Sequence, residues 1–209
     1  MSGGLDSAVT LYLAKKQGFQ CRCLIFDYGQ RHYREVASAK KIAREAKCPS
    51  QVVKIRLPWK GSALLDKKLK IPLRPKGIPA TYVPGRNIIF LSFALSFAEA
   101  SRAEAIFIGA HTQDYSGYPD CRASFLTAFQ KAAAAGTKAG VEKKAIRIIS
   151  PLINKKKAEI IKIGANLKVP LELTRSCYQG GVRPCNKCDS CYYRMRGFRE
   201  AGIKDPALG

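Results

Sequence analysis

The spacing of apolar residues predicts helices and strands in alternation along the 209-residue chain. Over residues 5–17, directly after Ser-Gly-Gly, apolar positions recur at the spacing of one helical face. Further helices are expected over 33–46, 87–101, 122–135 and 156–167. Short apolar runs predict strands over 20–26, 51–57, 105–110 and 146–149. Residues 58–86, rich in Pro, Gly and Lys, are expected to be an irregular insertion.

This alternation predicts an α/β fold with a doubly wound, mostly parallel sheet covered by helices on both faces. In such a sheet, ligands bind beyond the carboxyl ends of the strands. The loops over 27–32 and 109–122 each follow an expected strand. We therefore expect these two loops to form walls of a ligand site.

Composition narrows the class of protein. The chain is 46% hydrophobic and 25% charged, which is typical of a globular protein and excludes a disordered or collagen-like chain. Its longest apolar stretches, such as IIFLSFALSFA, reach about half of the roughly 20 residues that a bilayer crossing needs, so no membrane span is expected. The sequence MSGGLDS lacks the features of a secretory signal, and a cytoplasmic, reducing location is expected.

The net charge is unusual: 37 Lys and Arg against 15 Asp and Glu give +22. Such a charge attracts polyanions, of which nucleic acid is the obvious class, although ATP or anionic lipid would satisfy the same electrostatics. The basic residues are spread along the chain in short runs, without a known nucleic-acid-binding pattern. Solvated faces are the favoured interpretation, and a nucleic-acid surface is the alternative.

The first residues have the composition of a phosphate-binding loop. The segment Ser2–Ser7 places two glycines, two hydroxyls and a carboxylate at the start of the first expected helix. Glycines let backbone N–H groups approach an anion closely, and a helix N-terminus adds partial positive charge. A simple helix cap is the alternative, but a cap does not need two glycines. A kinase-type phosphate loop is excluded, because the Gly-Lys-Ser/Thr sequence is absent.

Four of the eight cysteines lie within fifteen residues of one another: Cys177, Cys185, Cys188 and Cys191. Their spacing, with glycines and a proline between them, is typical of a closed tetrahedral zinc site with a structural role. An iron–sulfur cluster uses the same ligands, and unpaired or disulfide-bonded cysteines are the remaining alternative. We expect the site to hold residues 192–198 against the main sheet.

Two segments have the chemistry to contact a planar substrate. Residues 82–87 end in Arg86, which can pair with a carboxylate or phosphate, and Asn87, which can also cap the following helix. Residues 114–122 combine two aromatic rings, two carboxylates, a hydroxyl and a guanidinium. Rings can stack on a heterocycle and carboxylates can accept from its amino edge. Neither His32 nor His111 is assigned a role.

Together, the segments SGGLDS, FDYGQRH, TYVPGRN, DYSGYPDCR, SCYQGG and PCNKCDSC resemble the 7-cyano-7-deazaguanine synthase family, known as QueC. The resemblance runs from Ser2 to about Pro206. It implies an adenine nucleotide alpha hydrolase-like fold and an ATP-dependent ligase that forms carbon–nitrogen bonds. Such an enzyme converts 7-carboxy-7-deazaguanine and ammonia into 7-cyano-7-deazaguanine through adenylated intermediates, in queuosine and archaeosine precursor biosynthesis.

The resemblance also implies roles for individual residues. ATP would be bound by Ser2, Gly3, Gly4, Leu5, Asp6, Ser7, Asp27, Gln30 and Arg31, with Ser2, Asp6 and Ser7 taking part in catalysis. The deazaguanine would be positioned by Arg86, Asn87, Tyr115, Ser116, Asp120 and Arg122. Cys177, Cys185, Cys188 and Cys191 would bind structural Zn²⁺, and Mg²⁺ would accompany ATP. Residues 1–170 would form the ATP-binding domain, which belongs to the PP-loop superfamily, and 171–209 a zinc-binding segment packed on it.

The chain departs from the family pattern at two places. An Asn is expected after the 105–110 strand, where this chain has His111 or Thr112, and an aromatic residue is expected where it has Arg175. Three other activities stay open: transfer of the activated carboxylate to another amine such as a protein terminus, modification of tRNA, and a zinc-stapled nucleic-acid-binding module. Assembly into a homodimer is also left open.

Overall fold

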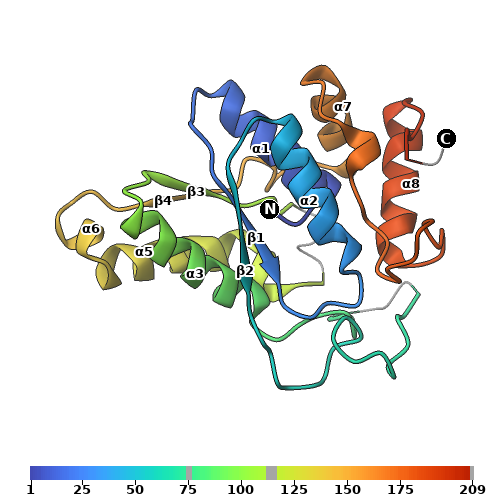
Figure 1. The fold of residues 1–209 in the computed structure, drawn as a ribbon, viewed down its shortest axis with the longest axis horizontal. Helices are drawn as coiled ribbons and strands as arrows, with labels where there is room; N and C mark the ends of the chain where they lie inside the picture. The colour runs from blue at the N-terminus through green and yellow to red at the C-terminus, as the bar shows by residue number, and fades with distance from the viewer. Residues whose placement is uncertain (74–76, 112–116, 208–209) are drawn as a thin grey trace.

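The computed structural model describes residues 1–73, 77–111 and 117–207. Figure 1 shows the course of the chain. Its helices are α1 (Leu5–Lys16), α2 (Arg34–Glu45), α3 (Arg86–Ala100), α5 (Ala123–Gly136), α6 (Lys138–Val141), α7 (Lys157–Asn166) and α8 (Asp189–Ala201), with short 3₁₀ turns at Pro119–Cys121 and Leu171–Leu173. Its strands are β1 (Cys23–Asp27), β2 (Ser50–Lys54), β3 (Ala105–Phe107) and β4 (Arg147–Ile149).

The α/β class and the expected elements are confirmed. Each expected helix and strand is present, while α6 and α8 were not expected from the spacing of apolar residues. Strand β3 is shorter than the expected 105–110, and Gly109 beyond its end lies so close to Asp6 and Ser7 that a Cβ would be 3.1 Å from their backbone. Within the described part of residues 58–85 there is no helix or strand, as expected for an irregular insertion.

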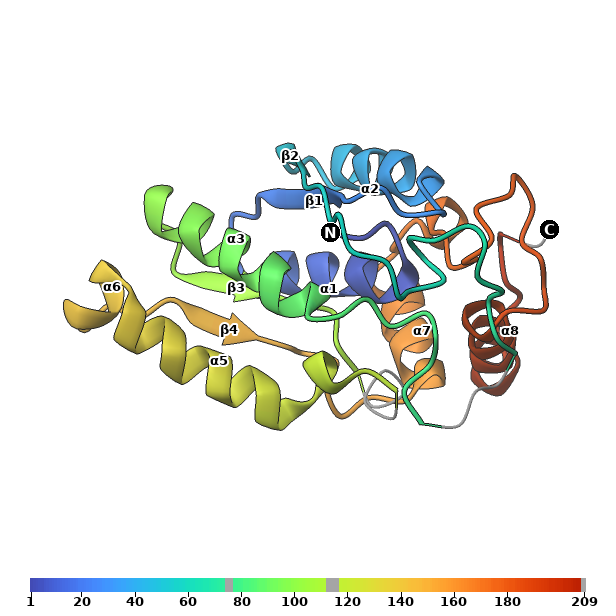
Figure 2. The ribbon, with the colours of Figure 1, turned by 90° about the horizontal axis from the view of Figure 1, so that it is seen from below.

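In the described part of the chain, all strand pairing is parallel, as predicted. Strand β1 pairs with β2 from Cys23↔Ser50 to Asp27↔Lys54, and β3 pairs with β4 from Ala105↔Arg147 to Phe107↔Ile149. These are two separate two-stranded sheets among the described residues, and Figure 2 shows α1 close to both. A cavity of about 1200 Å³ lies between the pairs and is lined there by apolar side chains such as Leu24, Phe97 and Ile106.

The main core joins the first helix to the C-terminal third of the chain. Leu5 and Val9 of α1 pack with Ile160 and Ile161 of α7, and Phe198 of α8 completes this cluster. At Gly164 the helices α1 and α7 come so close that a Cβ would lie 2.9 Å from a methyl group of Val9. Helices α1 and α7 are therefore held in fixed relation by tight packing.

The C-terminal helix corrects one expectation. Residues 192–198 were expected to lie against the main sheet, but α8 packs along α7, and both views show the two helices side by side (Figures 1 and 2). Gly197 makes this approach achievable, because a Cβ there would lie 2.4 Å from Cγ of Lys157. A buried ion pair between Arg194 and Asp205, at 2.6 Å, fixes the chain that follows α8.

In the described part of the chain, none of the helices combines the length and the apolar character that a bilayer crossing requires.

Candidate active site

The loop before α1 has the geometry of an anion-binding turn. Gly3 has a φ of +80° and lies against α2, where a Cβ would come within 2.3 Å of the carbonyl oxygen of Glu35. The hydroxyl of Ser7 donates to the carbonyl of Gly4 at 3.0 Å, and the backbone N–H of Gly4 donates to Ser2 Oγ at 3.2 Å. Only glycine fits position 3, so the loop conformation is fixed by the residues that the sequence pattern singled out.

Leu5 contributes differently from its neighbours in the loop. Its side chain lies in the main core and is 3% exposed. Only its backbone can therefore face a ligand. The N-terminus of α1 has no side-chain cap among its hydrogen bonds, which leaves its first N–H groups available to an anion.

Asp6 forms the centre of a buried group of charges. Lys157 Nζ, from the first turn of α7, lies 2.6 Å from Asp6 Oδ1 and 3.0 Å from Nε2 of His111. His111 Nε2 lies 3.4 Å from the other carboxylate oxygen of Asp6. Burial would raise the pKa of Asp6, but the charges of Lys157 and His111 outweigh burial and hold it well below its usual value. Asp6 is therefore a carboxylate at neutral pH that fixes a lysine beside the loop.

Lys157 was missed by the sequence analysis. Its side chain is 11% exposed and lines the same cavity as Ser2, Gly4 and Ser7. The helix over 156–167 was expected. A lysine in the first turn of a helix is unfavourable next to the positive end of the helix dipole, and this unusual position could have marked Lys157 as a functional residue. His111 was left without a role, and the structure places it at 1% exposure in the same group.

A second wall of the cavity is formed by the start of α3. Nη1 of Arg86 donates to the hydroxyl of Tyr28 at 3.2 Å, and both residues line the cavity. Burial would lower the pKa of Arg86, but Tyr28 outweighs it and the pKa is raised. Burial raises the pKa of Tyr28 to about 12. The wall therefore presents a permanent cation and a neutral phenol, a pair suited to an anionic group on a planar substrate.

Asn87 and Asp120 are joined to each other. The backbone N–H of Asn87 donates to Asp120 Oδ2 at 2.9 Å, and its side-chain amide donates to the Asp120 carbonyl at 3.1 Å. Asp120 is 5% exposed, and its carboxylate satisfies the first turn of α3. Asn87 lines the cavity, whereas Asp120 lies behind it.

The remaining expected residues differ in their access to the cavity. Gln30 is 3% exposed and its amide bonds internally to Tyr28 N–H, the Phe26 carbonyl and Glu35. The guanidinium of Arg31 donates to the Lys67 carbonyl. Neither these two residues nor Asp27 or Arg122 lines the cavity, while the neighbouring Tyr28, His32 and Glu35 do. Tyr115 and Ser116 lie outside the described residues.

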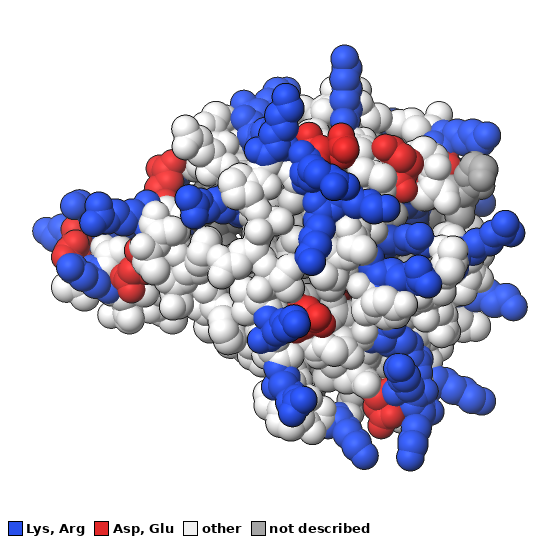
Figure 3. Space-filling view, in the orientation of Figure 1, with Lys and Arg blue, Asp and Glu red and all other residues white. Residues whose placement is uncertain are grey.

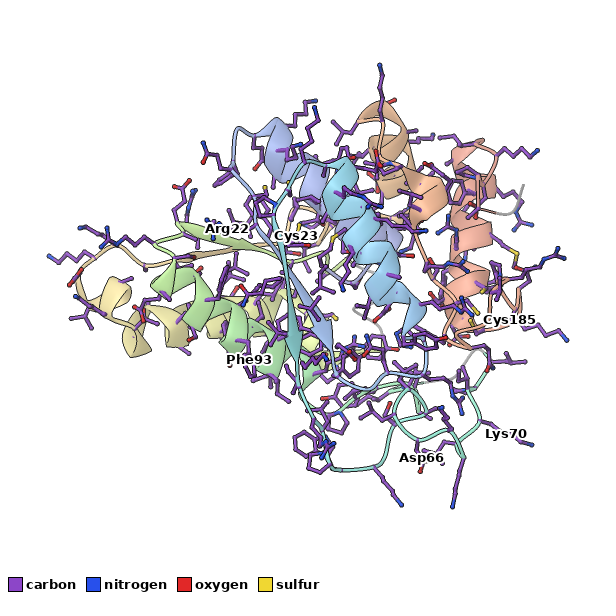
Figure 4. All side chains as sticks on the ribbon, viewed as in Figure 1. Arg22, Cys23, Asp66, Lys70, Phe93 and Cys185 are labelled. Atoms are coloured by element: carbon purple, nitrogen blue, oxygen red, sulfur yellow. The ribbon has the colours of Figure 1, made fainter. Side chains whose placement is uncertain are left out.

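The four C-terminal cysteines come together as predicted. Their sulfur atoms all lie within 4.8 Å of one another, and Figure 4 shows Cys185 beside the start of α8. Four sulfurs about 2.3 Å from one zinc ion would lie about 3.8 Å apart, close to the 4.0 Å between Cys185 Sγ and Cys191 Sγ. The backbone N–H groups of Cys185 and Cys188 donate to Cys177 Sγ and Cys185 Sγ. This arrangement fits a tetrahedrally bound metal ion.

Thiol protonation within the cluster is uneven. Hydrogen bonds from Cys188 and Cys191 lower the pKa of Cys177, while their bonds with Cys177 raise the pKa of Cys188 to about 11 and raise that of Cys191 as well. The thiols are therefore bonded to one another through their protons. A bound cation would replace the shared protons, as expected for a metal site.

Nearly the whole chain is similar in sequence to a family of known proteins. The family model described as "Queuosine biosynthesis protein QueC" matches residues 1–202. A protein of Acetivibrio thermocellus, "7-cyano-7-deazaguanine synthase", is 52% identical over 98% of this chain and 93% of its own length. A "7-cyano-7-deazaguanine synthase 2" of Desulfitobacterium hafniense is 51% identical over 99% of this chain and 89% of its own.

Among solved structures, a U34-tRNA thiolase, NcsA of Methanococcus maripaludis, is 17% identical, with a TM-score of 0.49, over 96% of this chain and 63% of the thiolase. This likeness is too low to support an argument about this chain. By contrast, the family model matches residues 1–202, and the two relatives named above are about 50% identical over nearly the whole length of this chain. The phosphate loop, the Arg86 wall and the four-cysteine cluster all lie inside the matched region, and the chain belongs to the QueC family.

Proposed function

We propose that this protein converts 7-carboxy-7-deazaguanine and ammonia into 7-cyano-7-deazaguanine, with ATP cleaved to AMP and pyrophosphate. The observation that carries the proposal is the family match over residues 1–202, which includes the whole loop Ser2–Ser7. Relatives about 50% identical to this chain bear the name of this synthase. The structure adds a site with the charges that such a reaction requires.

The phosphates of ATP would bind at the N-terminus of α1. Backbone N–H groups of Gly3, Gly4 and Leu5, with the hydroxyls of Ser2 and Ser7, provide donors for the departing pyrophosphate. Lys157 adds a positive charge that is already fixed at 2.6 Å from Asp6. The Ser7 hydroxyl and the Gly4 N–H now bond within the loop and would turn toward the phosphates when ATP binds. Lys157 is already in place, and Asp6 acts by holding it.

The carboxylate of the deazaguanine would face Arg86. Its guanidinium can orient a carboxylate oxygen toward the α-phosphate, so that this oxygen forms the new bond to phosphorus as the bond to pyrophosphate breaks. Ammonia then displaces AMP to form the amide. A second ATP adenylates the amide oxygen with release of pyrophosphate, and loss of AMP and a proton from the nitrogen gives the nitrile. Tyr118, whose hydroxyl is 2.8 Å from Thr81 Oγ1, offers a ring on which the heterocycle can stack. Asn87, Tyr115, Ser116, Asp120 and Arg122 remain our candidates for the other substrate contacts.

Two metals are proposed for different reasons. Zn²⁺ suits the four-cysteine cluster, because a closed thiolate site holds structure and leaves no open position for chemistry. Mg²⁺ would enter with ATP and prefers oxygen ligands, for which Asp6 is the carboxylate of the loop.

Asp27 is a second carboxylate near the carboxyl end of β1. With Gln30 and Arg31, it remains our proposal for the region nearest the adenosine.

Residues 1–170 are proposed as the ATP-binding domain and residues 171–209 as the zinc-binding segment. We place the protein in the cytoplasm, where ATP is available and cysteine thiols stay reduced.

A homodimer is proposed on the outer face of α3. Ile88 and Phe93 are each 46% exposed on a helix whose only charged residues are Arg86 and Glu99, and Figure 4 shows Phe93 directed outward. The two side chains lie about 140° apart around the helix, so they flank its exposed face, which a second copy of the chain would cover. Light scattering after chromatography tests the dimer: the double variant Ile88→Lys, Phe93→Lys is expected to be a monomer. A wild-type monomer at micromolar concentration would contradict it.

Nucleic acid or protein is not proposed as the acceptor. Figure 3 shows Lys and Arg spread over the visible face, with acidic residues between them and no single basic stripe. This distribution favours solvated faces, although a net charge of +22 will still attract polyanions without sequence preference.

The decisive experiment is mass spectrometry of the products formed from ATP, ammonium and 7-carboxy-7-deazaguanine. The nitrile and AMP are expected to appear together. Replacing ammonium with a peptide that carries a free N-terminus should yield no adduct. Formation of a peptide conjugate in place of the nitrile would overturn the proposal.

A further inference from the structure

The segment that carries the first cysteine also touches the phosphate loop. The backbone N–H of Arg175 donates to the carbonyl oxygen of Gly3 at 2.9 Å, and Cys177 follows only two residues later. On the other side of the same loop, a Cβ on Gly4 would lie 3.4 Å from the Arg175 carbonyl. The loop is therefore held directly by a short stretch of backbone that ends at a metal ligand.

A second contact joins the cysteine cluster to the site. Gly180 has a φ of +73°, and a Cβ there would lie 2.6 Å from the carbonyl oxygen of Arg31 and 3.1 Å from Cα of His32. His32 Nε2 lies 3.0 Å from a carboxylate oxygen of Glu35, whose own carbonyl packs on Gly3. The second contact therefore reaches the same glycine of the phosphate loop through α2.

The cysteine loop has an irregular backbone that side-chain contacts hold in place. Residues 174–188, all of them described, form no helix or strand. The guanidinium of Arg175 donates to the Val182 carbonyl at 2.5 Å, so the side chain that departs from the family pattern ties the start of the loop to its middle. Arg194 also donates to Thr174 Oγ1 and Ser176 Oγ, and Tyr178 packs beside Tyr28 and Val83. A metal ion bound to four sulfurs would add the constraint that joins Cys177 to the three later cysteines.

We propose that metal binding at the four cysteines sets the affinity of the phosphate loop for nucleotide, with Arg175 and Gly180 as the positioning residues. The inference rests on the proposal that this loop binds ATP. Several backbone N–H groups must converge on one phosphate, and a displacement of about 1 Å in one of them weakens the set. With the metal bound, both contacts hold Gly3 in place. When the metal is lost, both contacts loosen together.

The first test separates this contact from metal binding itself. Gly180→Ala keeps all four cysteines but forces the cysteine loop away from Arg31. Gly202→Ala is the matched control, because Gly202 also has a positive φ, +70°, yet a Cβ there meets nothing within 4 Å. Both proteins are loaded with zinc, and metal content, ATP affinity by calorimetry and amide hydrogen exchange over residues 2–7 are measured.

Gly180→Ala is expected to hold one zinc ion per chain, to bind ATP about tenfold more weakly, and to exchange faster over residues 2–7. Gly202→Ala should match the wild type in both binding and exchange. Equal ATP affinity of the zinc-loaded Gly180→Ala and wild-type proteins would overturn the inference. If the zinc-loaded wild type binds no ATP at all, the proposed function fails instead, so the two failures are distinguishable.

The second test uses the reciprocity of coupled binding. If zinc strengthens ATP binding, ATP must strengthen zinc binding by the same factor. Saturating ATP is therefore expected to lower the fraction of zinc captured by a chelator at equilibrium in the wild type, and to have a smaller effect in Gly180→Ala. A zinc affinity that does not change with ATP in the wild type would contradict the coupling, whether or not the metal-free chain stays folded.

Discussion

At the scale of single residues, the site depends most on Lys157. Its ammonium is 2.6 Å from Asp6 and adds positive charge beside the phosphate loop. Lys157→Met keeps much of the apolar stem but removes that charge. We expect kcat/KM for ATP to fall by about 10²–10³-fold, the loss typical of one electrostatic contact to a leaving group. Pyrophosphate release is the measurement. Lys162→Met, on an exposed part of the same helix, is the control, and an equal loss in both variants would contradict the assignment.

The ion pairs of Asp6 predict how stability depends on pH. Lys157 and His111 depress the pKa of Asp6, so its charged form stabilises the fold. A depressed pKa contributes stability that is complete above the unfolded value, about 4, and is lost as pH falls toward the folded value. Asp6→Asn should therefore lower the free energy of unfolding by about 2 kcal/mol at pH 7, and by progressively less below pH 4. Urea titrations from pH 7 to 3 measure the difference, and a constant difference would contradict this cause.

The sequence predicted some of these residues and not others for physical reasons. Gly3, Gly4 and Asp6 are close neighbours in the chain, and the four cysteines lie within fifteen residues of one another. A local pattern was therefore sufficient to find each group. Lys157 and His111 reach Asp6 from positions 151 and 105 residues further along the chain, and only the packing of α1 against α7 and β3 brings them there. Gln30 has the right chemistry for a ligand, but the turn after β1 uses its amide internally.

At the scale of elements, the approach of α8 to α7 controls where Lys157 lies. A Cβ on Gly197 would come within 2.4 Å of Lys157 Cγ and 2.9 Å of Ile161 Cδ1. Gly197→Ala is expected to destabilise the fold by about 1–3 kcal/mol, as overpacking usually does, and to lower activity by displacing Lys157. Gly136→Ala, where a Cβ meets nothing within 4 Å, should leave both unchanged. Thermal unfolding and pyrophosphate release are measured together; an unchanged Gly197→Ala would show that the helices can separate without cost.

Helix α8 is the long element that the spacing of apolar residues did not predict. Helix α8 carries Arg, Tyr, Cys and only a few aliphatic side chains, and its buried residues include Arg194 and Gly197. Its stability comes from packing on α7 and from the Arg194–Asp205 pair, neither of which appears in a local pattern. The same limit explains why residues 192–198 were wrongly expected to contact the sheet. The path of the chain between Leu167 and Asp189 could not be derived from composition.

At the scale of the whole molecule, the charge of +22 should weaken the fold at low ionic strength. Like charges spread over a compact surface repel one another, and unfolding increases their separation. Salt screens this repulsion, with a Debye length that falls from about 30 Å at 0.01 M to about 10 Å at 0.1 M. The melting temperature is therefore expected to rise between 10 and 200 mM KCl, although salt also weakens the attraction between acidic side chains and their basic neighbours.

The prediction requires that repulsion outweigh the surface ion pairs. Exposed pairs such as Arg147–Glu104 contribute about 0–1 kcal/mol each, and the chain has 22 more basic than acidic residues, so most cations have no acidic neighbour to lose. Calorimetry in KCl and in potassium acetate separates general screening from binding of a particular anion, since both salts should act alike if screening is the cause. A melting temperature that falls with either salt would show that local ion pairs, and not the net charge, dominate the electrostatic energy of this fold.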